Sequence, residues 1–130
     1  MANSIQFMKG FEDRIMSSIR TFMPAQIVSF DNANQEADVQ PLYLENLFDE
    51  DMPGKMPMLE SVPVISFNLY QEDSGVSTAK VFKQSYRRGD VVFIAICDRD
   101  IDELQKKPFA PDSKKKFSLK DAVIIGGWNL

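Results

Sequence analysis

The chain has 130 residues and a net charge of −4, and 44% of its residues are hydrophobic and 26% charged. These values predict one soluble globular domain, and neither a bilayer-spanning apolar run nor a signal peptide is recognised. The net negative charge argues against binding to a nucleic-acid backbone. Because the chain has no histidine and only one cysteine, the usual zinc sites and histidine-dependent nucleophiles are excluded, and so is an intrachain disulfide.

Residues 4–22 have the period of an amphipathic helix. Its apolar stripe comprises Met8, Phe11, Ile15, Ile19 and Phe22. Pro24 disfavours helical backbone at the preceding residue, Met23, so the helix is predicted to end at about Phe22. The stripe could cover the chain's own domain or pack against a partner chain.

The next segment is typical of a β-hairpin. Residues 25–30 form a predicted strand, residues 31–36 form a polar turn, and residues 37–43 form the returning strand. Pro41 cannot donate a backbone hydrogen bond, which predicts a sheet edge or a strand end at this position.

Short strands and polar loops are predicted to alternate through the middle of the chain. Strands are expected over residues 60–67 and 78–86, and loops over residues 45–58, 68–77 and 105–116. The acidic and lysine-rich runs inside these loops are interpreted as solvated surface.

The strongest strand signal is the apolar run Val91–Cys97, which follows the turn Arg87–Asp90. The run is too short for a buried helix and is rich in β-branched residues, so it predicts a central strand buried on both faces. Phe93 is expected to fill the core, and Cys97 is expected to be a small buried core residue. Val123–Ile125 is predicted to close the sheet.

Together these segments predict a mainly β fold: a five-stranded OB-fold barrel preceded by an N-terminal amphipathic α-helix. We assign residues 1–23 to the helix and residues 24–130 to the OB-fold domain. No internal repeat and no further domain is recognised.

Three aspartates have the spacing of the first calcium ligands of a helix–loop–helix site: Asp98, Asp100 and Asp102. The sixth position of that loop requires glycine and holds Glu103, and the twelfth requires glutamate and holds Phe109. We therefore predict no metal site, no cofactor and no catalytic residue, and the protein is not expected to be an enzyme.

Three segments, in this order, resemble the N-terminal OB-fold domain of bacteriophage baseplate central spike proteins, which are the membrane-puncturing devices of contractile tails. The segments are PAQIVSFD with ADVQP (24–31 and 37–41), GDVVF with DRDID (89–93 and 98–102), and FSLKDAVIIGG (117–127). The resemblance covers about residues 24–127.

The resemblance implies a structural protein of the virion tail baseplate, made in the host cytoplasm. Such a protein would trimerise on the tail axis, contact the phage tail hub and tube proteins, and mount or form the puncturing tip, with only indirect contact to the host membrane. Spike proteins usually continue into a trimeric β-helical needle, whereas this sequence ends at Leu130. We therefore expect either a separate needle or tip chain, or an OB-fold hub. The histidine that often precedes the last strand in the family is replaced here by Lys116-Phe117.

The residues expected to carry this function lie at interfaces. Phe11, Ile15, Ile19 and Phe22 would bury against partner chains, and Arg99 would pair with an acid and hold a strand end. The alternative is an OB-fold ligand-binding module for oligosaccharide or single-stranded nucleic acid. Its stacking aromatics would be Phe67, Tyr70, Phe82, Tyr86 and Phe93. The acidic charge argues against specific nucleic-acid binding.

Overall fold

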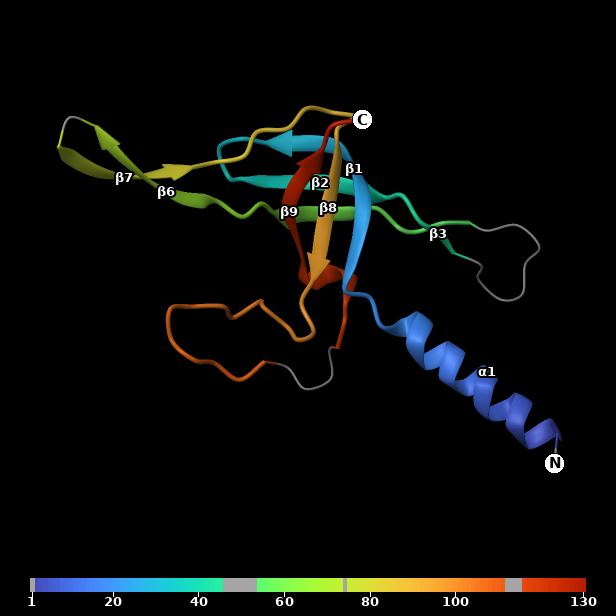
Figure 1. The fold of residues 1–130 in the computed structure, drawn as a ribbon. Helices are drawn as coiled ribbons and strands as arrows, with labels where there is room; N and C mark the ends of the chain where they lie inside the picture. The colour runs from blue at the N-terminus through green and yellow to red at the C-terminus, as the bar shows by residue number, and fades with distance from the viewer. Residues whose placement is uncertain (1, 46–53, 74, 112–115) are drawn as a thin grey trace. The chain divides into compact units, whose positions relative to one another are not determined.

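The computed structural model describes residues 2–45, 54–73, 75–111 and 116–130 (Figure 1). The chain divides into two compact units. One unit contains residues 1–21 and 96–121, and the other contains residues 22–95 and 122–130. No described helix has the length and apolar character needed to cross a bilayer.

The first unit contains helix α1 (Ala2–Ser18), which ends before the predicted boundary at Phe22. Phe22 instead begins a strand, and the Met23 side chain is only 4% exposed within the sheet. Backbone pairing and burial therefore override the helical period of the last apolar residues in the predicted stripe. The same unit holds the 3₁₀ helix η1 (Leu119–Asp121) and the loop that precedes it.

The second unit is built around a strongly curled five-stranded sheet that forms a half-barrel (Figure 1). Its strand order is β5 (Leu59–Pro63), β2 (Glu36–Pro41), β1 (Phe22–Asp31), β8 (Val91–Ile96) and β9 (Ala122–Trp128). The pairs β1–β2, β1–β8 and β2–β5 are antiparallel. This architecture confirms the predicted mainly β, OB-like fold with an N-terminal helix.

The order of the strands corrects the predicted centre of the sheet. The central strand is β1, and β8 lies between β1 and β9. The predicted hairpin is confirmed, because β1 and β2 pair directly and Pro41 is the last residue of β2. At the seam between the two edge strands, Val64 forms a parallel bridge with Ile124, and the Ile65 amide donates to the Ile124 carbonyl at 3.2 Å.

Two irregularities in strand pairing accompany the curl of the sheet, and both involve Asp38. The β1–β2 register shifts next to Ser29, whose hydroxyl donates to Asp38 Oδ2 at 3.0 Å. The β2–β5 register shifts at Asp38 itself, where the Ser61 amide donates to Oδ1 at 2.9 Å. Such bulges bend a strand and increase its twist, so one carboxylate holds two strands in the bent geometry of the half-barrel.

The hydrophobic core lies on one face of the sheet. Its buried side chains are Met23, Ala25, Ile27, Ala37, Val39, Met56, Leu59, Val62, Val64, Val92, Ile94, Ile96, Ala122 and Ile124. Strand β8 alternates strictly between partly exposed and buried positions, so it is not buried on both faces as predicted. Phe93 lies opposite the core face, and Cys97 is only partly buried. Both predicted core positions are therefore corrected.

A second hairpin occupies the region where the sequence predicted a loop over residues 68–77. Strands β6 (Phe67–Asp73) and β7 (Val76–Phe82) pair along their whole length, with Gly75 at a φ of +81° between them. The strand predicted over residues 78–86 is thus the second arm of this hairpin, and it is not part of the five-stranded sheet.

The predicted loops are described only in part. Strand β3 (Leu44–Glu45), at the start of the predicted loop 45–58, pairs with β4 (Gly54–Lys55) inside it. The acidic run at 49–51 lies outside the described residues. Residues 105–111 contain no strand, as predicted. The lysines at 114 and 115 lie outside the described residues.

Candidate interaction site

Three aromatic rings from three strands form a cluster on the second unit. We call Phe22, Phe93 and Trp128 the aromatic cluster. The Phe22 and Phe93 rings stack with centroids 5.1 Å apart, and the Trp128 ring meets Phe93 edge to face at 5.7 Å. Phe22 is 51% exposed and Trp128 is 57% exposed. The cluster is therefore a connected apolar group that remains in contact with solvent.

Strand register explains how Phe22 and Phe93 meet. In the β1–β8 ladder, Phe22 lies opposite Ala95 and Pro24 lies opposite Phe93, so the two phenylalanines are diagonal neighbours. Diagonal neighbours on one sheet face are within reach of aromatic side chains. Ile94, which follows Phe93 in β8, and Met23, which follows Phe22 in β1, are buried, so Phe22 and Phe93 lie on the face that the core does not use.

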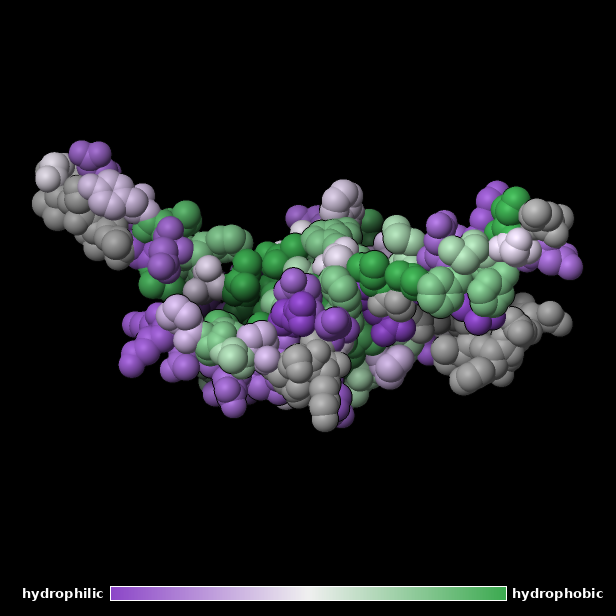
Figure 2. Space-filling view, turned by 90° about the horizontal axis from the view of Figure 1, so that it is seen from below, coloured by the Kyte–Doolittle hydropathy of each residue, from purple (hydrophilic) through white to green (hydrophobic). Residues whose placement is uncertain are grey.

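The predicted apolar stripe is separated into two groups. Phe11 and Ile15 lie on α1 and are exposed, and Ile19 follows the end of the helix with 41% of its surface exposed. Phe22 belongs to the aromatic cluster on the sheet. Further exposed apolar side chains on α1 are Ile5, Phe7, Met8 and Met16. Figure 2 shows hydrophobic side chains at the surface beside hydrophilic ones. Contact of these residues with a partner chain stays a prediction.

Arg99 lies in the loop that follows β8. Its side chain is exposed, and its backbone forms an isolated antiparallel bridge with Lys116. The backbone bridge ties the two ends of the loop together. Pairing of the Arg99 guanidinium with an acid stays a prediction.

The aromatics proposed for a ligand groove lie on different elements. Phe67 and Phe82 are opposite each other on the β6–β7 hairpin, and Tyr70 is exposed on the same hairpin. Tyr86 lies between β7 and β8, and Phe93 belongs to the aromatic cluster. These positions do not point to one continuous stacking platform.

Tyr86 packs inside the second unit rather than projecting as a stacking group. Its ring meets Phe30 edge to face at 5.8 Å, and its hydroxyl hydrogen-bonds to Gln84. Burial, together with the nearby Asp90 carboxylate, raises the pKa of the Tyr86 phenol. Tyr86 and Trp128 help line a pocket of about 190 Å³. This volume is below the roughly 300–1,000 Å³ typical of small-molecule sites.

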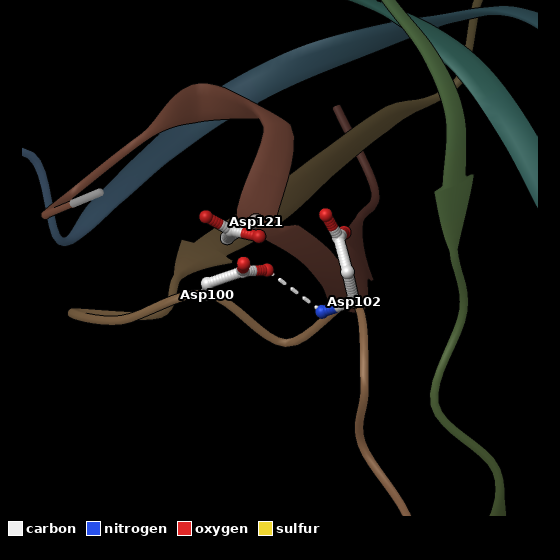
Figure 3. A group of neighbouring side chains, drawn as sticks. All are labelled: Asp100, Asp102 and Asp121. Carbon is white, nitrogen blue, oxygen red and sulfur yellow. Dashed lines mark hydrogen bonds between the residues drawn. The ribbon is translucent and has the colours of Figure 1, made fainter. Parts of the chain in front are cut away.

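The acidic stretch after β8 is arranged differently from the sequence expectation. Asp100 and Asp102 come close to Asp121 of η1, and Asp98 is not part of this group (Figure 3). Sequence spacing could not identify Asp121, because folding rather than sequence proximity brings it there. Nearby, burial raises the pKa of the Cys97 thiol, and the carboxylates of Asp121 and Asp98 raise it further. A thiol with a raised pKa is a poor nucleophile.

Two comparisons with known proteins concern the family of this chain. No curated protein is significantly similar to the chain. The model of one family, described as the phage protein Gp138 N-terminal domain, matches residues 23–127. That segment begins one residue after the start of β1 and ends one residue before the end of β9, so it spans the five-stranded sheet except for its first and last residues. The chain therefore belongs to the family of the phage protein Gp138 N-terminal domain.

Proposed function

We propose that this protein is a structural component of the phage virion, an OB-fold spike or hub protein of a contractile-tail baseplate. Three copies would assemble on the tail axis, contact the tail hub and tube proteins, and mount or form the puncturing tip. The protein would act through its interfaces and would have no catalytic role. The family match to a phage protein domain supports the virion assignment, and the resemblance described above supports the baseplate role.

The observation that carries this proposal is the aromatic cluster. A connected group of rings that remains half exposed in the single chain provides the kind of centre that protein interfaces use. Large contiguous apolar patches are uncommon on monomeric soluble proteins and mark interaction sites. The group lies on strands β1, β8 and β9, so a partner could dock on the sheet without disturbing the core.

The helix supplies a second surface for assembly. The exposed stripe on α1 contains Phe11 and Ile15, which are four residues apart and so share one face of the helix. Such a face can pack against an apolar surface of another chain. A cyclic assembly could bury both surfaces repeatedly, once per subunit. We therefore place Phe11, Ile15, Ile19 and Phe22 at contacts between copies or with the hub.

Native mass spectrometry of the purified full chain tests the assembly. The expected species is a trimer with three times the 14.8 kDa mass of the chain. The double variant Phe22→Ser/Trp128→Ser should shift the population to monomer, because it removes two rings of the aromatic cluster. Leu104→Ser, which changes an exposed leucine in the loop after β8, should remain trimeric.

Circular dichroism of the same variants separates loss of assembly from loss of fold. A folded monomeric double variant supports the aromatic cluster as an interface. A wild-type chain that remains monomeric at all accessible concentrations, with and without hub protein, contradicts the trimer. Antibody labelling of intact particles in electron micrographs tests location, and label along the capsid instead of the tail tip would contradict the baseplate role.

A further inference from the structure

Three carboxylates meet at the boundary between the loop after β8 and η1. One oxygen from each of Asp100, Asp102 and Asp121 lies within 4.8 Å of the other two, and Figure 3 shows the side chains converging from both segments. The Asp102 amide donates to Asp100 Oδ1 at 2.8 Å, which turns the loop back on itself. We call these three residues the carboxylate cluster.

The informative member of the carboxylate cluster is Asp121. Its side chain is only 1% exposed. Oδ1 accepts the Ile101 amide at 3.3 Å, whereas Oδ2 is buried and has no hydrogen-bond partner among the residues that the structure describes. A buried carboxylate oxygen without a partner costs free energy, and buried charges are normally paired or coordinate a metal. Among the described residues, no donor therefore compensates the burial of this carboxylate oxygen.

The backbone around Asp121 is held firmly, so this burial is not a consequence of a loose chain end. The Cys97 amide donates to the Asp121 carbonyl at 3.0 Å, and the Asp121 amide donates to the Ser118 carbonyl at 2.9 Å. These bonds, together with the Ile101 contact, place the carboxylate beside the loop that carries Asp100 and Asp102. The cluster is therefore positioned by the backbone on both of its sides.

We propose that the carboxylate cluster binds one divalent cation, with Ca²⁺ preferred over Mg²⁺. All three side chains offer oxygen, the ligand atom that both ions take. Two oxygens bound to one Ca²⁺ at about 2.3–2.6 Å are separated by at most roughly 5 Å, so the observed spacing is compatible with one shared ion. Mg²⁺ requires shorter bonds of about 2.0–2.1 Å and near-ideal octahedral geometry.

The gradient of exposure across the cluster suits ion entry. Asp121 is buried, Asp100 is partly buried, and Asp102 is exposed. The exposed side leaves room for water to complete the six to eight ligands of Ca²⁺, and it provides a path from solvent. The bound ion would compensate the buried Oδ2 and relieve repulsion among three carboxylates. It would fasten the loop after β8 to η1.

Calorimetric titration of CaCl₂ into the full chain, after removal of metal with a chelator, tests the site. One Ca²⁺ per chain is expected, and the melting temperature should rise with Ca²⁺ concentration because the ion binds only the folded state. Asp102→Asn should weaken Ca²⁺ binding by at least about tenfold, a loss typical of mutating residues that support a metal site. The matched control Asp98→Asn removes a charge from the same loop and should bind like wild type.

Several outcomes would overturn this inference, which does not depend on the proposed virion role. Absence of Ca²⁺ binding by the wild-type chain contradicts the site, as does equal affinity of the Asp102→Asn and Asp98→Asn variants. An identical rise in melting temperature with NaCl at matched ionic strength shows general screening and contradicts it too. Equal affinity for MgCl₂ overturns the preference for Ca²⁺. Asp102 is exposed, so its variant should fold even if Asp121→Asn does not.

Discussion

Gly127 leaves room for the ring of Tyr86. A Cβ atom at position 127 would lie 2.8 Å from Tyr86 Cε1, closer than real Cβ contacts allow, whereas a Cβ at the neighbouring Gly126 would meet nothing within 4 Å. The Tyr86 ring is also held by Phe30. The two adjacent glycines of β9 therefore differ sharply in whether a larger side chain can replace them.

Gly127→Ala should lower the free energy of unfolding by about 1–3 kcal/mol, the usual cost of overpacking, because the methyl group forces the Tyr86 ring to move. Urea denaturation measures this loss. Gly126→Ala is the matched control and should change stability little. In a Tyr86→Ala background the cost of Gly127→Ala should largely disappear, and a persistent cost would show that the ring is not the cause.

Asp31 holds the turn between β1 and β2. Its carboxylate accepts the Asn34 amide, the Asn34 side chain and the Ala33 amide. The hydrogen bonds from Asn34, with a further one from Ala33, lower the pKa of Asp31. A lowered folded-state pKa means that the charged form is favoured by folding.

The stabilisation from Asp31 should be complete above about pH 4, the ordinary pKa of an aspartate, and should be lost as pH falls through the lower folded-state pKa. Asp31→Ala should therefore destabilise the chain at neutral pH, and its difference from wild type should shrink in acid. Denaturant titrations of both proteins at a series of pH values measure this. Asp98→Ala is the control, and an equally pH-dependent loss for that variant would contradict the role of the turn.

Strand β8 carries different functions on its two faces. Ile94 is fully buried in the core, whereas Phe93 is partly exposed in the aromatic cluster. Ile94→Ala should cost about 2–5 kcal/mol, typical of a large-to-small core change, and Phe93→Ala should cost less in the isolated chain. Chemical denaturation below the concentration of assembly compares the two. A larger loss for Phe93→Ala would mean that the core lies on the opposite face.

The two hairpins show which strands a sequence can reveal. Residues 25–43 carried alternating apolar positions around an Asp-Asn turn, and that pattern arises because one face of β1 and β2 is buried. The β6–β7 hairpin has exposed residues such as Leu69, Tyr70 and Val81, so burial imposed no comparable alternation on its sequence. The polar residues at 71–73 are therefore typical of a loop by sequence alone. Gly75 is a local signal of the turn between β6 and β7.

Fast hydrogen exchange is expected for the β6–β7 hairpin. Its strands pair only with each other among the described sheets, and an isolated two-stranded hairpin is marginally stable in water. Mass-spectrometric exchange on the monomeric chain should show its amides exchanging well before those of β1 and β2. Equal protection of the two hairpins would contradict this expectation. Slower exchange after assembly would indicate that a partner covers the β6–β7 hairpin.

Candidate sites were harder to predict than strands because they combine distant segments. The spacing of Phe22 continues a helical stripe, yet strand pairing places its ring against Phe93, which in turn contacts Trp128. No metal-ligand motif in the sequence marks Asp121, yet the fold buries it beside Asp100. In both cases the residue type is visible in the sequence, but only the fold determines which residues lie next to it.

Stability of this protein should depend on its concentration. Among the described residues, more large hydrophobic side chains are exposed than buried, and association that buries them favours the folded state. The melting temperature of wild type should rise with protein concentration in calorimetry, while that of Phe22→Ser/Trp128→Ser should not. A concentration-independent wild-type value would argue that the exposed side chains do not mediate self-association.

The seam at Val64 and Ile124 also sets an order of events during synthesis. Strand β9 follows every other strand of the sheet in the chain, and it both pairs with β8 and meets the segment after β5. Until β9 leaves the ribosome, the nascent polypeptide has two open sheet edges and a core that lacks Ile124. Open edges are templates for pairing with other chains. The growing chain is thus expected to be most prone to pairing with other chains before β9 emerges.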